Sequence, residues 1–178
     1  MKVVGVLILG LAVVFPSGNA SSEMLSPLSM SANDSRVSWE GLAIVVNRQN
    51  PTSNLSLAQL RALFLGERKW WPKRHRVVLS AMRRGTPERA SVLRIVYKMD
   101  ERDLNNYFLY QVFEGEAPFP PVILRTPADV RKFVGITPGA VGYLRASDVD
   151  DSVKVVRVNG LLPDDDGYPM RLRARLPK

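Results

Sequence analysis

The residues best suited to chemistry in this sequence form one short run, Arg83, Arg84, Gly85 and Thr86. The run follows an apolar segment (76–82) typical of a strand. It ends at a helix start in which Thr86 is the cap and Pro87 the first helical residue. Two guanidinium groups beside the N–H groups of a helix start can bind an oxyanion. The alternative is a capped loop with solvated arginines, since Glu88 in the first helical turn would repel an anion.

No other group of side chains indicates catalysis. The 178-residue chain has no cysteine and one histidine, His75, which argues against thiolate or histidine metal sites and against a Ser-His-Asp triad. Residues 164–167 (DDDG) lack the ligand spacing of a calcium loop, so a turn is expected there. The sequence therefore predicts a protein that is not an enzyme and that has no metal ion and no cofactor.

The first twenty residues predict export. Lys2 precedes an uninterrupted apolar run (3–15), and Gly18 and Ala20 supply small residues for a cleavage site after Ala20. The run is shorter than the roughly 20 apolar residues that a spanning helix needs. We expect a signal peptide at 1–20, cleavage near Ala20, a periplasmic mature protein and no stable membrane insertion afterwards.

A basic composition could indicate a nucleic-acid partner, since the formal net charge is +8 and the pI about 10.1. Aromatic and basic residues also occur together at 69–76 (KWWPKRHR). Export argues against nucleic acid as a partner. We expect these tryptophans to pack a loop, with cations over their ring faces.

Short strand patterns alternate with capped helix patterns along the remaining chain. Helix starts are expected at four residues: Ser56, Thr86, Asp100 and Thr126. This alternation predicts an α/β domain at 42–160, with a mixed, mostly parallel sheet flanked by helices. A flexible lead-in is expected at 21–41, and a basic tail or an edge strand at 161–178. The helix spacing places four residues in the core: Leu60, Leu63, Phe133 and Val134.

Two segments resemble the phosphate-binding proteins of ABC transporters. Residues 56–66 (SLAQLRALFLG), with Trp70-Trp71-Pro72 after them, are similar to that family's "L-x-x-I-F-L-G-x-x-x-x-W" segment. Residues 137–144 (TPGAVGYL) resemble its "T-P-G-A-I-G-Y-V" segment. The resemblance spans about residues 42–160 and implies a small, single-lobe member with the type 2 periplasmic-binding-protein fold.

The resemblance also implies where an anion would bind. The family's "R-S-D-G-S-G-T" loop falls on residues 80–86 (SAMRRGT), where Gly85 and Thr86 match and Ser80 takes the place of the anion-binding arginine. The expected anion site therefore comprises Ser80, Arg83, Arg84, Gly85 and Thr86. The family closes two lobes on its ligand, and the phosphate loop of the N-terminal lobe has no counterpart in this sequence.

Two functions remain open from the sequence. One is a periplasmic solute-binding-protein-like role, with weak binding of phosphate or a similar oxyanion, linked to ABC-type uptake or sensing. The other is a non-catalytic envelope interaction module that has lost ligand binding. A single lobe leaves one wall of an anion site open, so a transporter or sensor protein, or a homodimer, would have to supply the other wall.

Overall fold

The computed structural model of the protein describes residues 38–72, 75–114 and 120–174. The described residues belong to one compact unit, Arg36–Lys178. The predicted signal peptide and the lead-in up to residue 37 lie outside the described residues. Among the described helices, none has the length and apolar character needed to cross a membrane.

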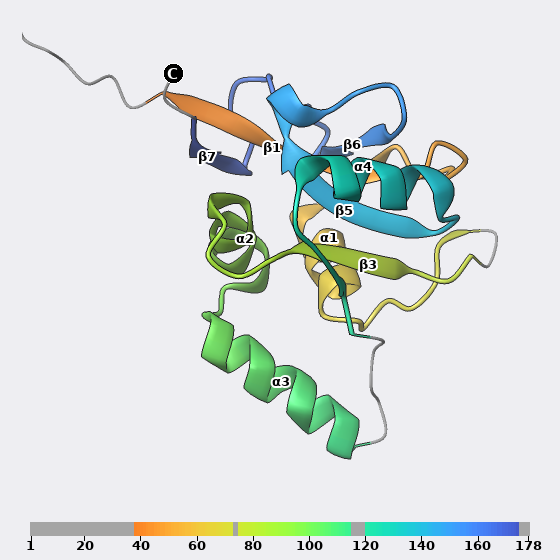
Figure 1. Cartoon of the computed structure of the whole chain (residues 1–178), viewed down its shortest axis with the longest axis vertical. Helices are drawn as coiled ribbons and strands as arrows, with labels where there is room; N and C mark the ends of the chain where they lie inside the picture. The colour runs from red at the N-terminus through yellow and green to blue at the C-terminus, as the bar shows by residue number, and fades with distance from the viewer. Residues whose placement is uncertain (1–37, 73–74, 115–119, 175–178) are drawn as a thin grey trace, which may run out of the picture. The chain divides into compact units, whose positions relative to one another are not determined.

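A seven-stranded sheet organises this unit (Figure 1). Its strands are β1 (Trp39–Val46), β2 (Asn54–Leu55), β3 (Val78–Met82), β4 (Val122–Leu124), β5 (Ala140–Arg145), β6 (Lys154–Val158) and β7 (Arg171–Arg173). The strand order is β2-β6-β1-β5-β3-β4, and β7 pairs with the first residues of β1. The antiparallel pairings all involve β1, whereas β2 with β6, β5 with β3 and β3 with β4 pair in parallel. The other strands therefore share one direction and β1 alone is reversed, which confirms the predicted mixed, mostly parallel sheet.

The helices begin where local sequence signals predict. They are α1 (Leu57–Phe64), α2 (Pro87–Val92), α3 (Glu101–Phe113) and α4 (Pro127–Ile136), with a π-helical turn after α2 (Leu93–Tyr97) and a 3-10 turn at Ala146–Asp148. The four predicted caps each accept a hydrogen bond from the backbone N–H three residues later: Ser56, Thr86, Asp100 and Thr126. These bonds satisfy amide groups that a helix start otherwise leaves without a partner, which fixes the start of each helix.

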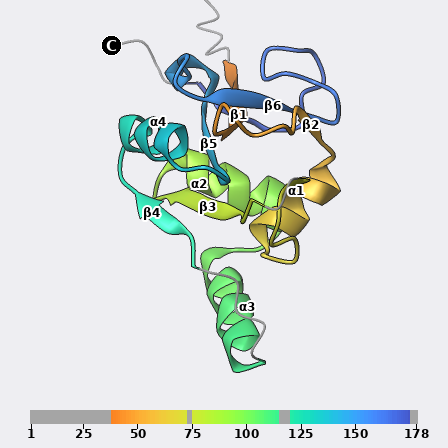
Figure 2. The same cartoon turned by 90° about the vertical axis from the view of Figure 1, so that its right-hand side faces the viewer.

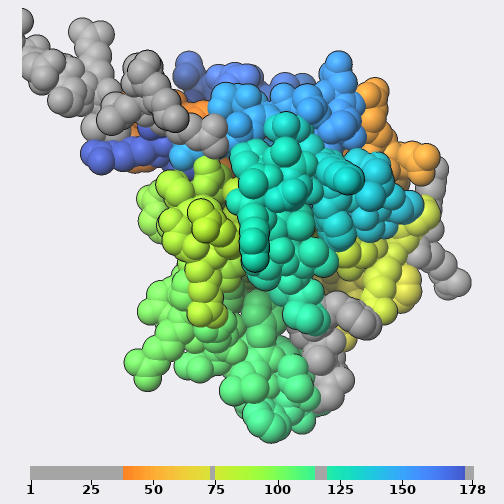
Figure 3. Space-filling model, in the orientation of Figure 1, coloured from red at the N-terminus to blue at the C-terminus, as the bar shows by residue number. Residues whose placement is uncertain are grey.

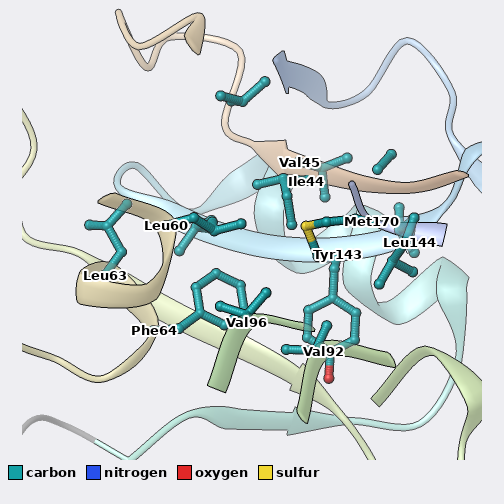
Figure 4. Packing of buried hydrophobic residues seen from close by; sticks show 14 of the residues in the cluster. Ile44, Val45, Leu60, Leu63, Phe64, Val92, Val96, Tyr143, Leu144 and Met170 are labelled. Carbon is teal, nitrogen blue, oxygen red and sulfur yellow. The ribbon is translucent and has the colours of Figure 1, made fainter. Parts of the chain in front are cut away.

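Helices cover both faces of the sheet (Figure 2). Gly142 of β5 faces α4, because a Cβ atom placed there would lie 3.1 Å from Val130 and 3.4 Å from Val134. The next residue, Tyr143, points to the opposite face, as alternation along a strand requires. Its ring lies 6.2 Å from that of Phe64 in α1, measured between centroids (Figure 4). Helices α1 and α2 therefore lie on the face opposite α4.

The predicted core residues lie in this packing. Leu60, Leu63 and Val134 are fully buried in the core cluster, and Phe133 is half-buried against it. The two leucines come from α1 and the other two residues from α4, so they support opposite faces of one sheet. Their burial confirms the helix faces that the 3.6-residue period predicts.

Leu63→Ala should lower the free energy of unfolding by about 2–5 kcal/mol, the cost of a cavity at a buried leucine. Leu63 is 1% exposed, whereas Leu109 of α3 is 56% exposed and serves as a matched control. Leu109→Ala should change stability by less than about 0.5 kcal/mol. Urea unfolding of both variants measures the difference. Equal effects would mean that α1 does not carry the core.

The folded domain extends beyond the expected boundaries at both ends. Strand β1 begins at Trp39, inside the segment expected as a lead-in. Near the C-terminus, β7 pairs with the start of β1, Met170 and Leu172 are buried, and the Tyr168 hydroxyl donates a 2.9 Å hydrogen bond to the Leu42 carbonyl. For 171–173 the structure thus has the edge strand rather than the loose tail.

Candidate functional site

Three neighbouring parallel strands, β5, β3 and β4, end at the same edge of the sheet. In open α/β sheets, ligands bind outside this carboxyl edge, where the loops leave the strands. Met82 pairs with Leu124, so Arg83 and Arg125 directly follow paired residues on adjacent strands. The Arg83 N–H also donates a 2.9 Å hydrogen bond to the Leu124 carbonyl, which holds the two loops together. This edge therefore presents exposed arginines from both loops.

The turn after β3 has a defined geometry. Gly85 has φ +82° and no atom within 4 Å of where a Cβ would lie, so glycine serves the left-handed backbone there and not a close contact. The Thr86 hydroxyl donates a 3.0 Å hydrogen bond to the Arg83 carbonyl and accepts one of 3.3 Å from the Arg89 N–H. Since its single proton is already donated, Thr86 supports the turn and has no proton left for an anion.

The two arginines of the turn differ in their contacts. Arg84 donates a 2.9 Å hydrogen bond to the Asn105 side chain of α3 and lies 3.5 Å from the Glu101 carboxylate. The Arg84 side chain is nevertheless 63% exposed. The exposed Arg83 side chain forms no ion pair within the described part of the chain. Arg83 is thus the cation of this turn best placed to take an external anion.

Ser80 does not join these residues. It lies within β3, is 1% exposed, and donates its hydroxyl proton to the Val141 carbonyl at 3.1 Å. Its oxygen also lies under Gly142, where an added Cβ would come within 2.5 Å. Ser80 therefore faces α4 inside the fold, whereas Arg83, Arg84, Gly85 and Thr86 stand together on the loop. Alignment with the family loop suggested Ser80, but the strand pleat turns it inward.

Glu88 differs most from its expected role. It is 4% exposed and accepts a 2.5 Å hydrogen bond from Nε of the buried Arg145 in β5. Arg145 also donates to the Glu40 carboxylate at 3.0 Å and to the Arg173 carbonyl at 2.9 Å. Glu88 thus points into the fold with its charge compensated, and its expected repulsion of an anion at the loop is correspondingly reduced.

Arg89, the next residue of α2, forms a second ion pair, which is part-buried. Its guanidinium makes a two-point contact with the Glu101 carboxylate of α3, one of the two bonds measuring 2.8 Å. The hydrogen bond from Arg89 lowers the pKa of Glu101 more than burial raises it. For Glu40, burial acts to raise the pKa, but hydrogen bonds from Ser147 and Arg145 outweigh it and the pKa is lowered.

These lowered pKa values predict a loss of stability in acid. A carboxylate whose pKa is lower in the folded state contributes stability above its unfolded pKa and loses that contribution as the pH falls through its folded pKa. The free energy of unfolding should therefore decline as the pH drops below about 4.5, the ordinary glutamate value. Glu101→Gln should flatten this decline, whereas Glu67→Gln, at an exposed residue, should not. Urea titrations between pH 7 and pH 3 measure both slopes, and identical slopes would contradict the assignment.

The two segments that carry the family resemblance meet at one structural contact. The indole N–H of the buried Trp71 donates a 2.8 Å hydrogen bond to the Gly139 carbonyl, which also accepts the Val78 N–H at 3.1 Å. The Arg68 guanidinium lies 6.0 Å from the Trp71 ring centroid, an arrangement of the kind expected for this loop. These motif residues hold the loop before β3 against the loop before β5, and they lie apart from the arginine turn along both strands.

The described ranges contain no cluster of three or more His, Cys, Asp or Glu side chains that could hold a metal ion.

Arg125 is the residue of this edge that the sequence did not predict. The short strand β4 carries only three residues, too few for a clear pattern, so the basic residue at its end was not recognised as part of the edge.

Comparison with known proteins gives a consistent likeness. No family model matches the sequence. The phosphate-binding protein PstS of Bacillus subtilis is 25% identical over 132 residues, which are 74% of this chain and 40% of that protein. An ABC-type phosphate transport receptor from Vibrio cholerae superposes with a TM-score of 0.64 at 19% identity, over 77% of this chain and 55% of the receptor. PstS from Borrelia burgdorferi gives 0.60 at 12% identity, over 76% and 55%.

These likenesses confirm the fold that the two sequence segments imply. Over about 77% of its length the chain shares the fold of the Vibrio cholerae receptor. It spans 40% of the curated relative and about half of the solved structures that it matches.

Proposed function

We propose that the protein is a periplasmic, non-catalytic solute-binding-protein-like component that binds phosphate or a similar oxyanion and serves ABC-type uptake or sensing. The observation that carries this proposal is the carboxyl edge of the sheet, where Arg83 and Arg84 follow β3 and Arg125 follows β4. Glu88, the acid nearest to Arg84 in sequence, is turned inward to Arg145. The edge thus offers guanidinium groups suited to a multiply charged oxyanion. The likeness to phosphate-binding proteins supports the same ligand class.

Binding to one exposed wall should be weak. Exposed charges are screened over about 8–10 Å at physiological ionic strength, and an anion bound on one side keeps much of its hydration. We expect a Kd between about 10 μM and 1 mM, weakening as salt rises. A second wall, supplied by a transporter or sensor protein or by another copy of the chain, would tighten it. Export with cleavage after Ala20 is part of this proposal and places Ser21 at the mature N-terminus.

Calorimetry with inorganic phosphate and sulfate tests the proposal at about 50 mM and about 200 mM salt, because the screening length shortens between these concentrations. Replacing both Arg83 and Arg84 by Ala should abolish the binding heat, and Arg125→Ala should weaken binding. Arg94→Ala is the matched control, because Arg94 is an exposed arginine on the π-helical turn and does not follow a strand of this edge. Absence of heat with both anions for the wild-type protein would overturn the proposal.

A second candidate, a non-catalytic envelope interaction module, has one observation in its favour. Helix α3 exposes four large apolar side chains: Leu109 (56%), Tyr110 (61%), Val112 (56%) and Phe113 (79%). Exposed apolar surface of this kind is typical of interaction sites. If the module binds a second copy of itself, light scattering should show a dimer that Phe113→Ser weakens, and phosphate should give no heat.

A further inference from the structure

A groove lies beside the arginine turn, between α3 and β4. Its volume is about 680 Å³, within the range of about 300–1,000 Å³ typical of small-molecule sites. The turn after β3, helix α3 and the segment entering β4 all contribute to its lining. Figure 3 shows these three segments, yellow-green, green and teal, meeting on one face of the unit.

The groove has a cationic part and an apolar part. Arg83, Arg84 and Arg89 contribute its positive charge, and none of the described residues that line it is Asp or Glu. Its apolar lining comes from α3 and from the segment at β4: Leu104, Phe108, Val112, Pro120, Pro121 and Ile123. A ligand that complements this lining must carry both an anionic group and an apolar body.

The spacing on α3 gives the groove a direction. Leu104, Phe108 and Val112 are four residues apart, so they lie in a row on one face of the helix. Asn105, next to the first of them, is held by Arg84 at 2.9 Å, which places the turn near the N-terminal half of α3. The apolar row thus leads away from the arginines over about 12 Å, from the helical rise of about 1.5 Å per residue.

The arginines are not equally occupied. Arg89 is committed to the Glu101 carboxylate, and Arg84 shares it at 3.5 Å. Arg83 forms no ion pair within the described residues. An anionic head group would therefore meet Arg83 first and Arg84 second, while Arg89 and Glu101 stay paired beneath them.

We infer that this groove binds a small organic oxyanion, of the class of aryl or alkyl phosphate monoesters. The head group meets Arg83 and Arg84, and the apolar body lies along the α3 row. This rests on the proposed function for the head group and goes beyond it in assigning the ligand an apolar body. Inorganic phosphate would leave the apolar row in water, whereas an organic body would cover Val112 and Ile123, which are 56% and 55% exposed.

Calorimetry with phenyl phosphate and with inorganic phosphate, on the full chain as exported, tests the inference. Phenyl phosphate should bind at least about tenfold more tightly, since a tenfold change corresponds to about 1.4 kcal/mol and covering one ring's apolar surface supplies that much. Arg83→Ala should weaken the binding of both ligands.

Val112→Ser and Leu109→Ser form the decisive pair. Both residues lie on α3 and both are 56% exposed, but only Val112 lines the groove. Val112→Ser should remove most of the preference for phenyl phosphate, and Leu109→Ser should leave it unchanged. Thermal melting of each variant verifies that it folds.

Each other outcome is decisive. Equal affinity for the two ligands overturns the inference and leaves the proposed function standing. A preference for phenyl phosphate that both serine variants reduce equally, or that neither reduces, also overturns it, because the apolar body then lies elsewhere. If neither ligand binds, the inference and the proposed function both fail.

Discussion

Arg145→Met is expected to lower the free energy of unfolding by about 3–5 kcal/mol, the cost of removing one partner from a buried ion pair. Arg145 is 3% exposed and bonds to the carboxylates of Glu88 at 2.5 Å and Glu40 at 3.0 Å. The substitution leaves two carboxylates near each other without their shared cation. It also removes the bond to the Arg173 carbonyl, which ties β7 to the sheet. Urea unfolding at pH 7 measures the loss.

Two further variants separate this network from general loss of charge. Arg157→Met removes an arginine that is 48% exposed and 3.9 Å from Asp165, and it should cost less than about 1 kcal/mol. The double variant Arg145→Met with Glu88→Gln should lose less unfolding free energy than the two single variants lose together. In the double variant one fewer buried carboxylate is left without its cation. Additive losses, or equal losses at Arg145 and Arg157, would contradict the role given to the network.

The local features of the fold could be predicted from sequence because local chemistry decides them. Ser56 and Thr126 are caps because a hydroxyl and a side chain three residues later satisfy each other's backbone amides. The burial of Leu63 and Val134 follows from helical period alone. In contrast, the reversal of β1 depends on pairing with β5, β6 and β7, nearly a hundred or more residues away, as in Leu42 opposite Arg145. No local pattern carries that information.

In the candidate site, too, only the features set by local sequence could be predicted. Gly85 and Thr86 form the turn that their types indicate, and Arg83 stays exposed on it. The direction of Glu88 could not be predicted, because it is set by Arg145, 57 residues further along the chain. An acidic side chain in the first turn of a helix normally faces solvent and interacts favourably with the helix dipole. Here the buried guanidinium of Arg145 on β5 binds the Glu88 carboxylate inside the fold. The negative charge of Glu88 is therefore directed away from Arg83 and Arg84.

Gly139, the glycine of the T-P-G-A segment, is required by its backbone angle and by a close contact. Gly139→Ala should lower the free energy of unfolding by about 2–5 kcal/mol. Gly139 has φ +81°, and a Cβ there would lie 2.1 Å from the Arg76 carbonyl oxygen, a backbone atom. The left-handed backbone costs a non-glycine residue about 1–2 kcal/mol, and forced displacement in a packed site about 1–3 kcal/mol. The displacement would also disturb the Gly139 carbonyl, which accepts the Trp71 indole N–H.

Gly160→Ala isolates the steric part of this effect. Gly160 has φ +83°, nearly the same backbone, but no atom lies within 4 Å of the position of its Cβ. Its substitution should therefore cost only the about 1–2 kcal/mol of left-handed strain. Tryptophan fluorescence during urea unfolding follows both variants, since Trp71 is bonded to Gly139 and remote in sequence from Gly160. If the two substitutions lower the free energy of unfolding equally, the close approach of Gly139 to Arg76 does not hold the two family-like segments together. The presence of these segments in this chain must then have a cause other than packing.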